Sequence, residues 1–257
     1  MNKNGCKCAF ALAAFCLPSA ITSCGGGGMT STTPPPIQET TSTLVVVAGQ
    51  VDVLPLTVSL DGQALATVSY LDSTNPLIVN SGQHELVISD ANGPTLSQSI
   101  TLGPNSHNTF IADGFGIGTT YWLLLTDDTT PAGNSNAKLR VVDGAVTATE
   151  PMLDVYVVPF GSAPSGAPTL SGLTFDEVYS GPPLSYQVVA PGSYDVYFTP
   201  TGTTNVLYHT GALALAANQN RTVVFLNVCS GPTTSQPSYE CNLSGGPYTF
   251  VTLADLN

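Results

Sequence analysis

The feature that most constrains the fold is the regular alternation of short apolar runs with turn-forming residues from residue 44 onward. Runs rich in valine, leucine, threonine and tyrosine recur about every ten residues, separated by stretches such as LDGQ, NSGQ, DANGP, APGS and TPTGT. β-Branched and aromatic residues favour strands, whereas glycine, proline, asparagine and aspartate favour turns. The pattern predicts an all-β fold, and its spacing is typical of β-sandwiches.

Single runs indicate how deeply each strand is buried. Residues 153–157 (LDVYV) and 193–199 (SYDVYFT) alternate in polarity, which predicts strands with one buried face. Residues 222–228 (TVVFLNV) are apolar on both faces and predict a central strand. Residues 212–220 (ALALAANQN) fit either a helix or a strand followed by a turn.

The folded region contains an internal repeat. Three pairs of segments occur in the same order and at similar spacing: 56–65 with 153–162, 78–88 with 188–198, and 99–112 with 212–225. The repeat predicts two tandem β-domains of about 100 residues each. Polar and turn residues cluster in DDTTPAGNSNA, so we place the domains at 44–133 and 134–257 and expect a linker between them.

The N-terminus carries an export signal. Lys3 and Lys7 precede the apolar segment CAFALAAFCLPSAI, which has the length of a secretory signal and is too short to span a bilayer. Ile21-Thr22-Ser23-Cys24 follows and resembles the lipobox of bacterial lipoproteins. The resemblance implies removal of residues 1–23 and acylation of Cys24, with palmitate-type chains as a durable membrane anchor. The alternative is an ordinary signal peptide with an incidental cysteine.

Residues 24–43 have the composition of a tether. Four glycines after Cys24 predict a flexible joint, and the proline run at 34–36 predicts a stiffer spacer. Residue 25 is glycine, not the aspartate that favours inner-membrane retention in enteric bacteria. By analogy, we expect a protein of the cell envelope held at the outer membrane of a Gram-negative bacterium.

The charge of the chain excludes one class of partner. Loss of Lys3 and Lys7 with the signal takes the formal charge from −12 to −14, because three strong bases remain beside seventeen acids. Such a body repels nucleic acid and anionic lipid heads. Its acidity serves solubility or, alternatively, cation binding. We expect no nucleic-acid partner and no cofactor.

Two cysteines remain after processing. Cys6, Cys8 and Cys16 leave with the signal and Cys24 takes the lipid, so Cys229 and Cys241 form a candidate disulfide in an oxidising compartment. A zinc site is the alternative, but the three histidines are widely spaced and match no ligand pattern. We expect the bond to hold the tail segment YTFVTL (248–253) as an added edge strand of the second domain.

Several segments resemble the bacterial envelope family known as domain of unknown function 4397 (DUF4397). The segments AKLRVV (137–142), LDVYV (153–157) and APGSYDVYFTPTGT (190–203) carry the resemblance. It is strong over 137–228 and weaker over 44–128. DGAVTATEP (143–151) replaces the family's Ala-Ser-Pro-type turn. The resemblance implies secreted or lipid-anchored sandwiches of immunoglobulin-like type, and it implies no activity.

Motifs with catalytic or metal-binding chemistry are weak. GFGIG (114–118) is rich in glycine, but a strand-like segment follows where a phosphate-binding loop needs a helix, so a hairpin turn is favoured. GNSNA (133–137) lacks the strand–turn–helix context of a serine nucleophile. Asp127 and Asp128 can bind calcium, but without a calcium-loop pattern they are expected to be solvated turn carboxylates. We predict no metal site.

Tyrosines offer a candidate binding surface. Tyr156, Tyr186 and Tyr197 are candidate ligand-binding residues, because exposed tyrosines can stack on a sugar or a partner protein. Cross-strand packing on the sheet surface is the alternative and is favoured. Two functional classes remain. The favoured one is a non-enzymatic envelope module that binds or scaffolds a protein or glycan, and the other is an envelope hydrolase whose site forms no readable motif.

Overall fold

The computed structural model describes residues 40–50, 55–91, 93–114, 120–145, 152–175, 186–230, 240–241 and 248–256. Met1–Gln38 and Glu39–Asn257 are separate units, and every described residue lies in the second. The described residues form strands and turns without a helix, which confirms the all-β prediction. Among them, no helix is long and apolar enough to cross a membrane.

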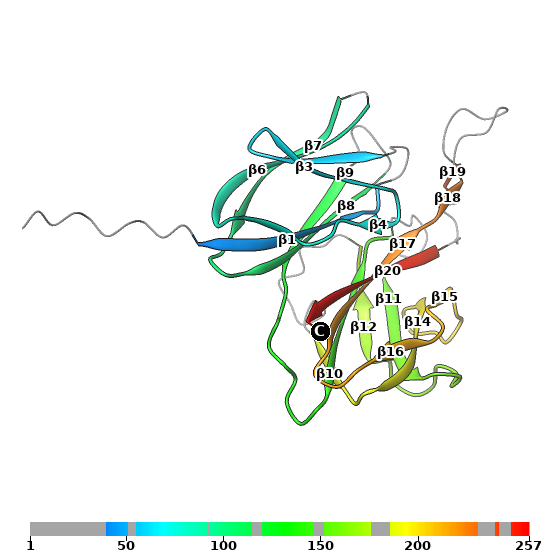
Figure 1. Ribbon diagram of the computed structural model, residues 1–257. Helices are drawn as coiled ribbons and strands as arrows, with labels where there is room; N and C mark the ends of the chain where they lie inside the picture. The colour runs from blue at the N-terminus through cyan, green and yellow to red at the C-terminus, as the bar shows by residue number, and fades with distance from the viewer. Residues whose placement is uncertain are drawn as a thin grey trace, which may run out of the picture. The chain divides into compact units, whose positions relative to one another are not determined.

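The strands between residues 41 and 126 form a first sandwich (Figure 1). Sheet A has the order β4-β1-β8-β9, and β5 also pairs with β1. Its strands are β1 (Thr41–Ala48), β4 (Asp72–Ser73), β5 (Leu77–Asn80), β8 (His107–Gly114) and β9 (Thr120–Thr126). Sheet B has the order β3-β2-β6-β7. Its strands are β2 (Leu56–Leu60), β3 (Gln63–Val68), β6 (Gly82–Asp90) and β7 (Gly93–Leu102).

The strands between residues 137 and 256 form a second sandwich (Figure 1). Sheet C has the order β13-β10-β17-β20. Its strands are β10 (Ala137–Asp143), β13 (Gln187–Val189), β17 (Asn220–Asn227) and β20 (Tyr248–Leu256). Sheet D has the order β12-β11-β14-β15, and β16 also pairs with β14. Its strands are β11 (Leu153–Pro159), β12 (Leu170–Leu173), β14 (Gly192–Pro200), β15 (Tyr208–His209) and β16 (Leu213–Leu215).

The two sandwiches share one pairing scheme. In the first, β1 pairs in parallel with β8 and antiparallel with β5. In the second, β10 pairs in parallel with β17 and antiparallel with β13. The pairs β2–β6 and β11–β14 are likewise equivalent. The segments aligned in the sequence therefore contain strands that occupy the same places in the two sheets.

Local chemistry explains individual connections. β2 and β3 are joined by Asp61 and Gly62, whose φ angles of 50° and 79° suit the two-residue hairpin turn typical of Asp-Gly. The segment at 212–220 contains β16 followed by a turn, so the strand alternative holds there. β1 already begins at Thr41, within the segment expected to be tether.

Three apolar clusters hold these sheets together. One fills the first sandwich and includes Leu44 and Phe110, and a second fills the other sandwich and includes Phe198 and Phe225. The third joins sheet A to sheet C, with Val47 and Ile111 against Leu226. Burying apolar surface on both faces of a strand requires apolar residues at successive positions. β17 meets that requirement and pairs on both edges, which confirms the predicted central strand.

The tail extends sheet C. β20 pairs antiparallel with β17 along its length, which confirms the added strand predicted at 248–253. Tyr248 and Phe250 pack into the second sandwich, whereas Val251 and Leu253 belong to the cluster between sheets A and C. A short pair, β18 (Cys229–Ser230) with β19 (Glu240–Cys241), precedes it.

Candidate binding groove at the junction of the sandwiches

The outer face of sheet A is only partly covered by sheet C. Side chains alternate between the two faces of a strand. Thr43 and Val45 therefore share a face with Val47, which is buried in the cluster between the sheets. Thr43 lies directly opposite Ile78 on β5 and His107 on β8. Ile78, Thr43 and His107 thus form a row across sheet A, on the face that sheet C covers only in part.

A groove of about 590 Å³ lies over this uncovered part of the face. Its floor includes Thr43, Val45 and Thr109, and Ile78 at its margin is 79% exposed. Residues 252–255 of β20 line it from sheet C. The groove thus joins strands from both sandwiches, with apolar and hydroxyl-bearing side chains intermixed.

A buried arginine lies beside the groove. Arg140 on β10 is 1% exposed, and its guanidinium pairs with the carboxylate of Asp127, which lines the groove. Arg140 Nε donates to Thr222 Oγ1 at 2.9 Å, and Nη1 donates to the Thr126 carbonyl at 3.3 Å. Burial of an arginine requires such compensation, because an unpaired buried charge is costly.

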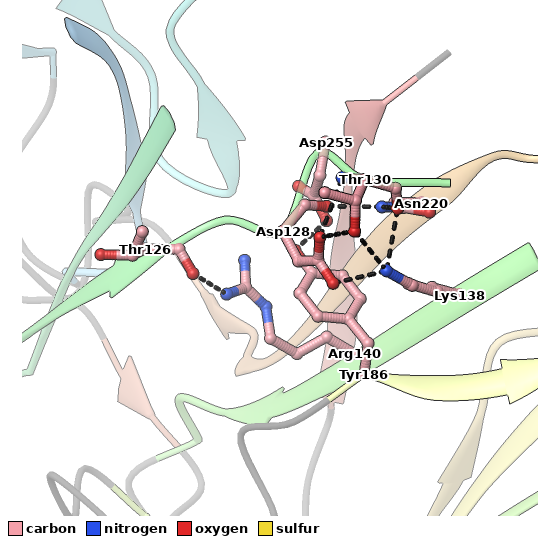
Figure 2. Close-up of polar contacts among 8 residues, drawn as sticks. All are labelled: Thr126, Asp128, Thr130, Lys138, Arg140, Tyr186, Asn220 and Asp255. Carbon is pink, nitrogen blue, oxygen red and sulfur yellow. Dashed lines mark hydrogen bonds and ion pairs between the residues drawn. The ribbon is translucent and has the colours of Figure 1, made fainter. Parts of the chain in front are cut away.

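Asp255 and Tyr186 complete this network (Figure 2). The ring of Tyr186 lies 4.7 Å from the guanidinium carbon of Arg140, a cation–π contact. Asp255 Oδ2 accepts from Tyr186 Oη at 2.8 Å and from Thr222 Oγ1 at 2.6 Å. Burial raises the pKa of Asp255 and that of Tyr186. We call Thr109, Asp127, Arg140, Tyr186, Thr222 and Asp255 the Arg140 network.

The linker after β9 is bound to the second sandwich. Lys138 Nζ pairs with Asp128 and donates to the Thr130 carbonyl at 2.8 Å, and Asn220 Nδ2 donates to the same carbonyl at 2.9 Å (Figure 2). Burial is the largest single effect on the Asp128 carboxyl and raises its pKa, but the hydrogen bonds from Lys138 and Thr130 and the charge of the Lys138 ammonium together outweigh it and lower the pKa to about 2. A linker that looks loose in sequence is therefore anchored.

These contacts correct the expectation for Asp127, whereas Asp128 is a partly exposed turn carboxylate, 38% exposed, that also pairs with Lys138. Asp127 is not a solvated turn carboxylate: its side chain is 5% exposed and accepts from Thr109 Oγ1 at 2.9 Å as well as from Arg140. Each carboxylate is neutralised by a cation of the protein. Among the described residues, no group of three or more His, Cys, Asp or Glu side chains is arranged to hold a metal ion.

The three tyrosines do not form one platform. Tyr156 is 4% exposed, contrary to its expected exposure, and its hydroxyl lies 3.5 Å from the Thr203 carbonyl oxygen. Tyr197 is its direct cross-strand partner and stacks on His209 at 5.0 Å between ring centroids. Tyr186 belongs to the Arg140 network. Cross-strand packing therefore accounts for Tyr156 and Tyr197.

Of the remaining predicted sites, Cys24 lies outside the described residues, as do the signal peptide and most of the tether. Residues 115–118 of GFGIG also lie outside them, but β8 and β9 pair antiparallel on either side, as in a hairpin. The GNSNA segment leads into β10, which begins at its last residue, Ala137, and Asn134 and Ser135 have positive φ in a turn.

The backbone places Cys229 directly opposite Cys241 in the β18–β19 pair. Directly opposed residues have Cα atoms about 4.5–5.5 Å apart, within the range that a disulfide requires. The bond itself remains a prediction. We expect alkylation of the protein isolated from its source cells to modify neither thiol unless the protein is first reduced, as read by mass spectrometry. Two thiols that react without reduction would refute the disulfide.

Loss of this disulfide is expected to loosen the segment between β17 and β20. Closing a loop of about 13 residues contributes roughly 3 kcal/mol in the simplest model of unfolded-chain entropy. We expect Cys229→Ser to speed proteolysis of the segment between β17 and β20, with cleavage in the tether unchanged as the internal control.

Sequence reasoning missed the central residue of the site. Arg140 is a lone arginine in the apolar strand LRVVD, and a base in such a strand needs a buried partner. This lone base, taken together with the acids Asp127 and Asp128 in the segment before the strand, could have indicated a buried ion pair. Ile78, His107 and Asp255 carried no comparable signal, because only the packing of distant strands brings them together.

The fold and groove define an all-β protein of two sandwiches with an open junction. The family model described as domain of unknown function (DUF4397) matches residues 42–156, from β1 into β11. The stronger resemblance was expected over 137–228, whereas the match lies mainly in the first sandwich. A comparison with curated proteins gave no match.

Thirteen chains of solved structures are similar to this chain, among them the following two. One, described as a candidate cell adhesion protein from Parabacteroides distasonis, has 11% identity and a TM-score of 0.23, covering 83% of this chain and 98% of its own. The other concerns alpha-glucan recognition by family 41 carbohydrate-binding modules from streptococcal virulence factors. It has 10% identity and a TM-score of 0.25, covering 71% of this chain and 93% of its own.

Proposed function

We propose that this chain is a lipid-anchored protein of the bacterial cell envelope that binds or scaffolds an envelope partner without catalysing a reaction. In this proposal, Cys24 carries the acyl chains, the glycine- and proline-rich tether spaces the body from the outer membrane of a Gram-negative cell, and the sandwiches carry the binding surface.

The groove between sheet A and β20 is the observation that carries the binding role. It is open and of ligand-binding size, at about 590 Å³. The charged groups beside it have partners within the protein: Arg140 pairs with Asp127, and Asp255 accepts hydrogen bonds from the hydroxyls of Thr222 and Tyr186. A groove whose charged side chains already have partners within the protein offers a ligand a fixed shape and fixed hydrogen-bonding groups.

A hydrolase needs a nucleophile within hydrogen-bond reach of a base, or a metal. Two histidines of the described residues contact carboxylates, His84 with Asp61 and His209 with Asp195. Neither contact involves a hydroxyl or thiol nucleophile, and neither of these two histidines lines the groove. The third, His107, lines the groove, and no side-chain hydrogen bond from it to a described hydroxyl or thiol is found. These contacts support a binding module over an enzyme.

The anchor is tested by Cys24→Ala. Loss of the acylated thiol removes the hydrophobic chains, each methylene of which contributes about 0.8 kcal/mol to membrane binding. We expect the variant to be unacylated and to move from the detergent phase to the aqueous phase in phase partitioning. A variant that still partitions fully into detergent would contradict lipid anchoring.

The binding role is tested with the same variant. Cys24→Ala protein, freed from the membrane, is expected to be retained saturably by the envelope fraction of the source cells. Thermally unfolded protein serves as the control and is expected to lose this saturable component. Retention that never saturates, or that survives unfolding, would argue against a specific binding module.

A further inference from the structure

β20 has one unused edge in the described part of the chain. It is the last strand of sheet C and pairs there only with β17. Such an edge presents backbone N–H and C=O groups that can pair with another strand. The stretch from Thr252 to Asp255 borders the groove. Any strand added there would lie over the uncovered face of sheet A.

The floor of the groove continues an interface that the protein already forms. Sheet C covers Val47 and Ile111 on sheet A through β17 and β20. Next to them, Val45 packs against this cluster but is only partly buried and also lines the groove, and beyond it Thr43 and Ile78 line the groove outside the cluster. Ile78 is the most exposed large apolar side chain among the described residues. One more strand beside β20 would extend this sheet-on-sheet packing across them.

Charge indicates the chemistry of the added strand. Without the signal, the chain has seventeen acids and three bases, and two of those bases, Lys138 and Arg140, are paired with Asp128 and Asp127. Asp255 lies at the groove end of β20. A second copy of this acidic chain would be repelled, whereas a basic segment would be attracted.

From these observations we propose that β20 accepts an extended segment of a partner protein as an additional strand. The segment alternates apolar and polar residues, lays its apolar side chains on Val45 and Ile78, and carries a lysine or arginine toward Asp255. Main-chain hydrogen bonds supply the affinity in this mode, and the alternate side chains supply the selectivity. The proposal rests on the proposed binding role and specifies its partner.

The probe is a fluorescein-labelled peptide of alternating valine and threonine with a lysine at each end, titrated against the full chain by fluorescence anisotropy. Two matched peptides accompany it. One has proline in place of each threonine, which removes every second backbone N–H and disfavours pairing as a regular strand, and the other has glutamate in place of each lysine. We expect each replacement to weaken binding by roughly tenfold or more.

Two protein variants locate the site. Ile78→Asp changes the groove and is expected to weaken peptide binding by roughly tenfold or more. Val188→Asp is the matched control, since Val188 is also an exposed apolar strand residue (58%) but lies on β13, at the other edge of sheet C. We expect Val188→Asp protein to bind the peptide as tightly as the unmodified protein does. Hydrogen exchange should show new protection at Thr252–Asp255 on peptide binding.

Several results would overturn the proposal. They are no binding up to about 1 mM, equal binding of the proline peptide, or equal loss in both protein variants. Displacement of the peptide by chitohexaose would assign the groove to a glycan, and protection of β20 by self-association alone would assign it to a second copy. If Cys24→Ala protein that also carries Ile78→Asp is still retained saturably by the envelope fraction, the binding role stands and this assignment of its site fails.

Discussion

Replacing Arg140 with methionine is expected to lower the free energy of unfolding by about 3–5 kcal/mol, the cost of leaving one member of a buried ion pair without its partner. Asp127 would remain buried without the guanidinium, and Thr222 and Tyr186 would lose their contacts with it. The measurement is chemical denaturation at neutral pH. A loss below about 1 kcal/mol would mean that the network contributes little to stability.

Two variants separate this effect from the loss of a side chain. Arg221→Met is the matched control, because Arg221 is a half-buried arginine on β17 for which no ion pair is found in the described residues. We expect it to change stability by less than about 1 kcal/mol. Combining Arg140→Met with Asp127→Leu should recover most of the loss, since both charges are then absent.

Replacing Asp143 with asparagine is expected to stabilise the protein at neutral and higher pH. Asp143 is buried, and burial raises the pKa of its carboxyl to about 7, although the Ala145 N–H donates to it at 2.9 Å. An asparagine oxygen can accept the same bond. Asp113 lines the same small cavity, so the new amide has a carboxylate nearby.

The sign of the pH dependence follows from this raised pKa. Folded Asp143 holds its proton up to about pH 7, whereas the unfolded residue loses it near 3.8, so stability falls as pH rises between these values. The difference corresponds to at most roughly 4 kcal/mol. We expect Asp143→Asn to match the unmodified protein at pH 4 and to exceed it by about 2–4 kcal/mol at pH 8.

Asp128→Asn provides the opposite case. The folded pKa of Asp128 is lowered to about 2, so its ionised form contributes stability above pH 4 that is lost as pH falls through 2. This variant should therefore destabilise the protein at pH 8.

The Asp143 prediction has its own contradicting outcome. Equal stability of Asp143→Asn and the unmodified protein at pH 8 would show that Asp143 ionises at little cost.

The strands were predictable because their signal is local. Alternation over residues 153–157 and the doubly apolar run at 222–228 correspond to β11 and β17, and Asp-Gly at 61–62 forms the turn expected of it. The face of a strand can be read from such a pattern, but what covers that face cannot. Tyr156 lies on the face expected to be exposed, yet its hydroxyl meets the Thr203 carbonyl of another segment.

The candidate site was largely beyond sequence reasoning for the same reason. Val45, Ile78, His107 and Asp255 come from four strands far apart in the chain. Their contact depends on sheet C covering only part of sheet A, and no short-range pattern encodes that partial cover. The burial of Asp127 likewise depends on Arg140, whose position opposite the linker follows from the packing of β10.

Photocrosslinking in intact cells tests most directly whether the groove is where this protein meets the partner proposed for it. A benzophenone amino acid is placed at Ile78 in one protein and at Val188 in another, both at exposed strand positions. We expect one discrete crosslinked species from position 78, competed by excess Cys24→Ala protein, and none from position 188. No species from 78, or the same species from both positions, would contradict it.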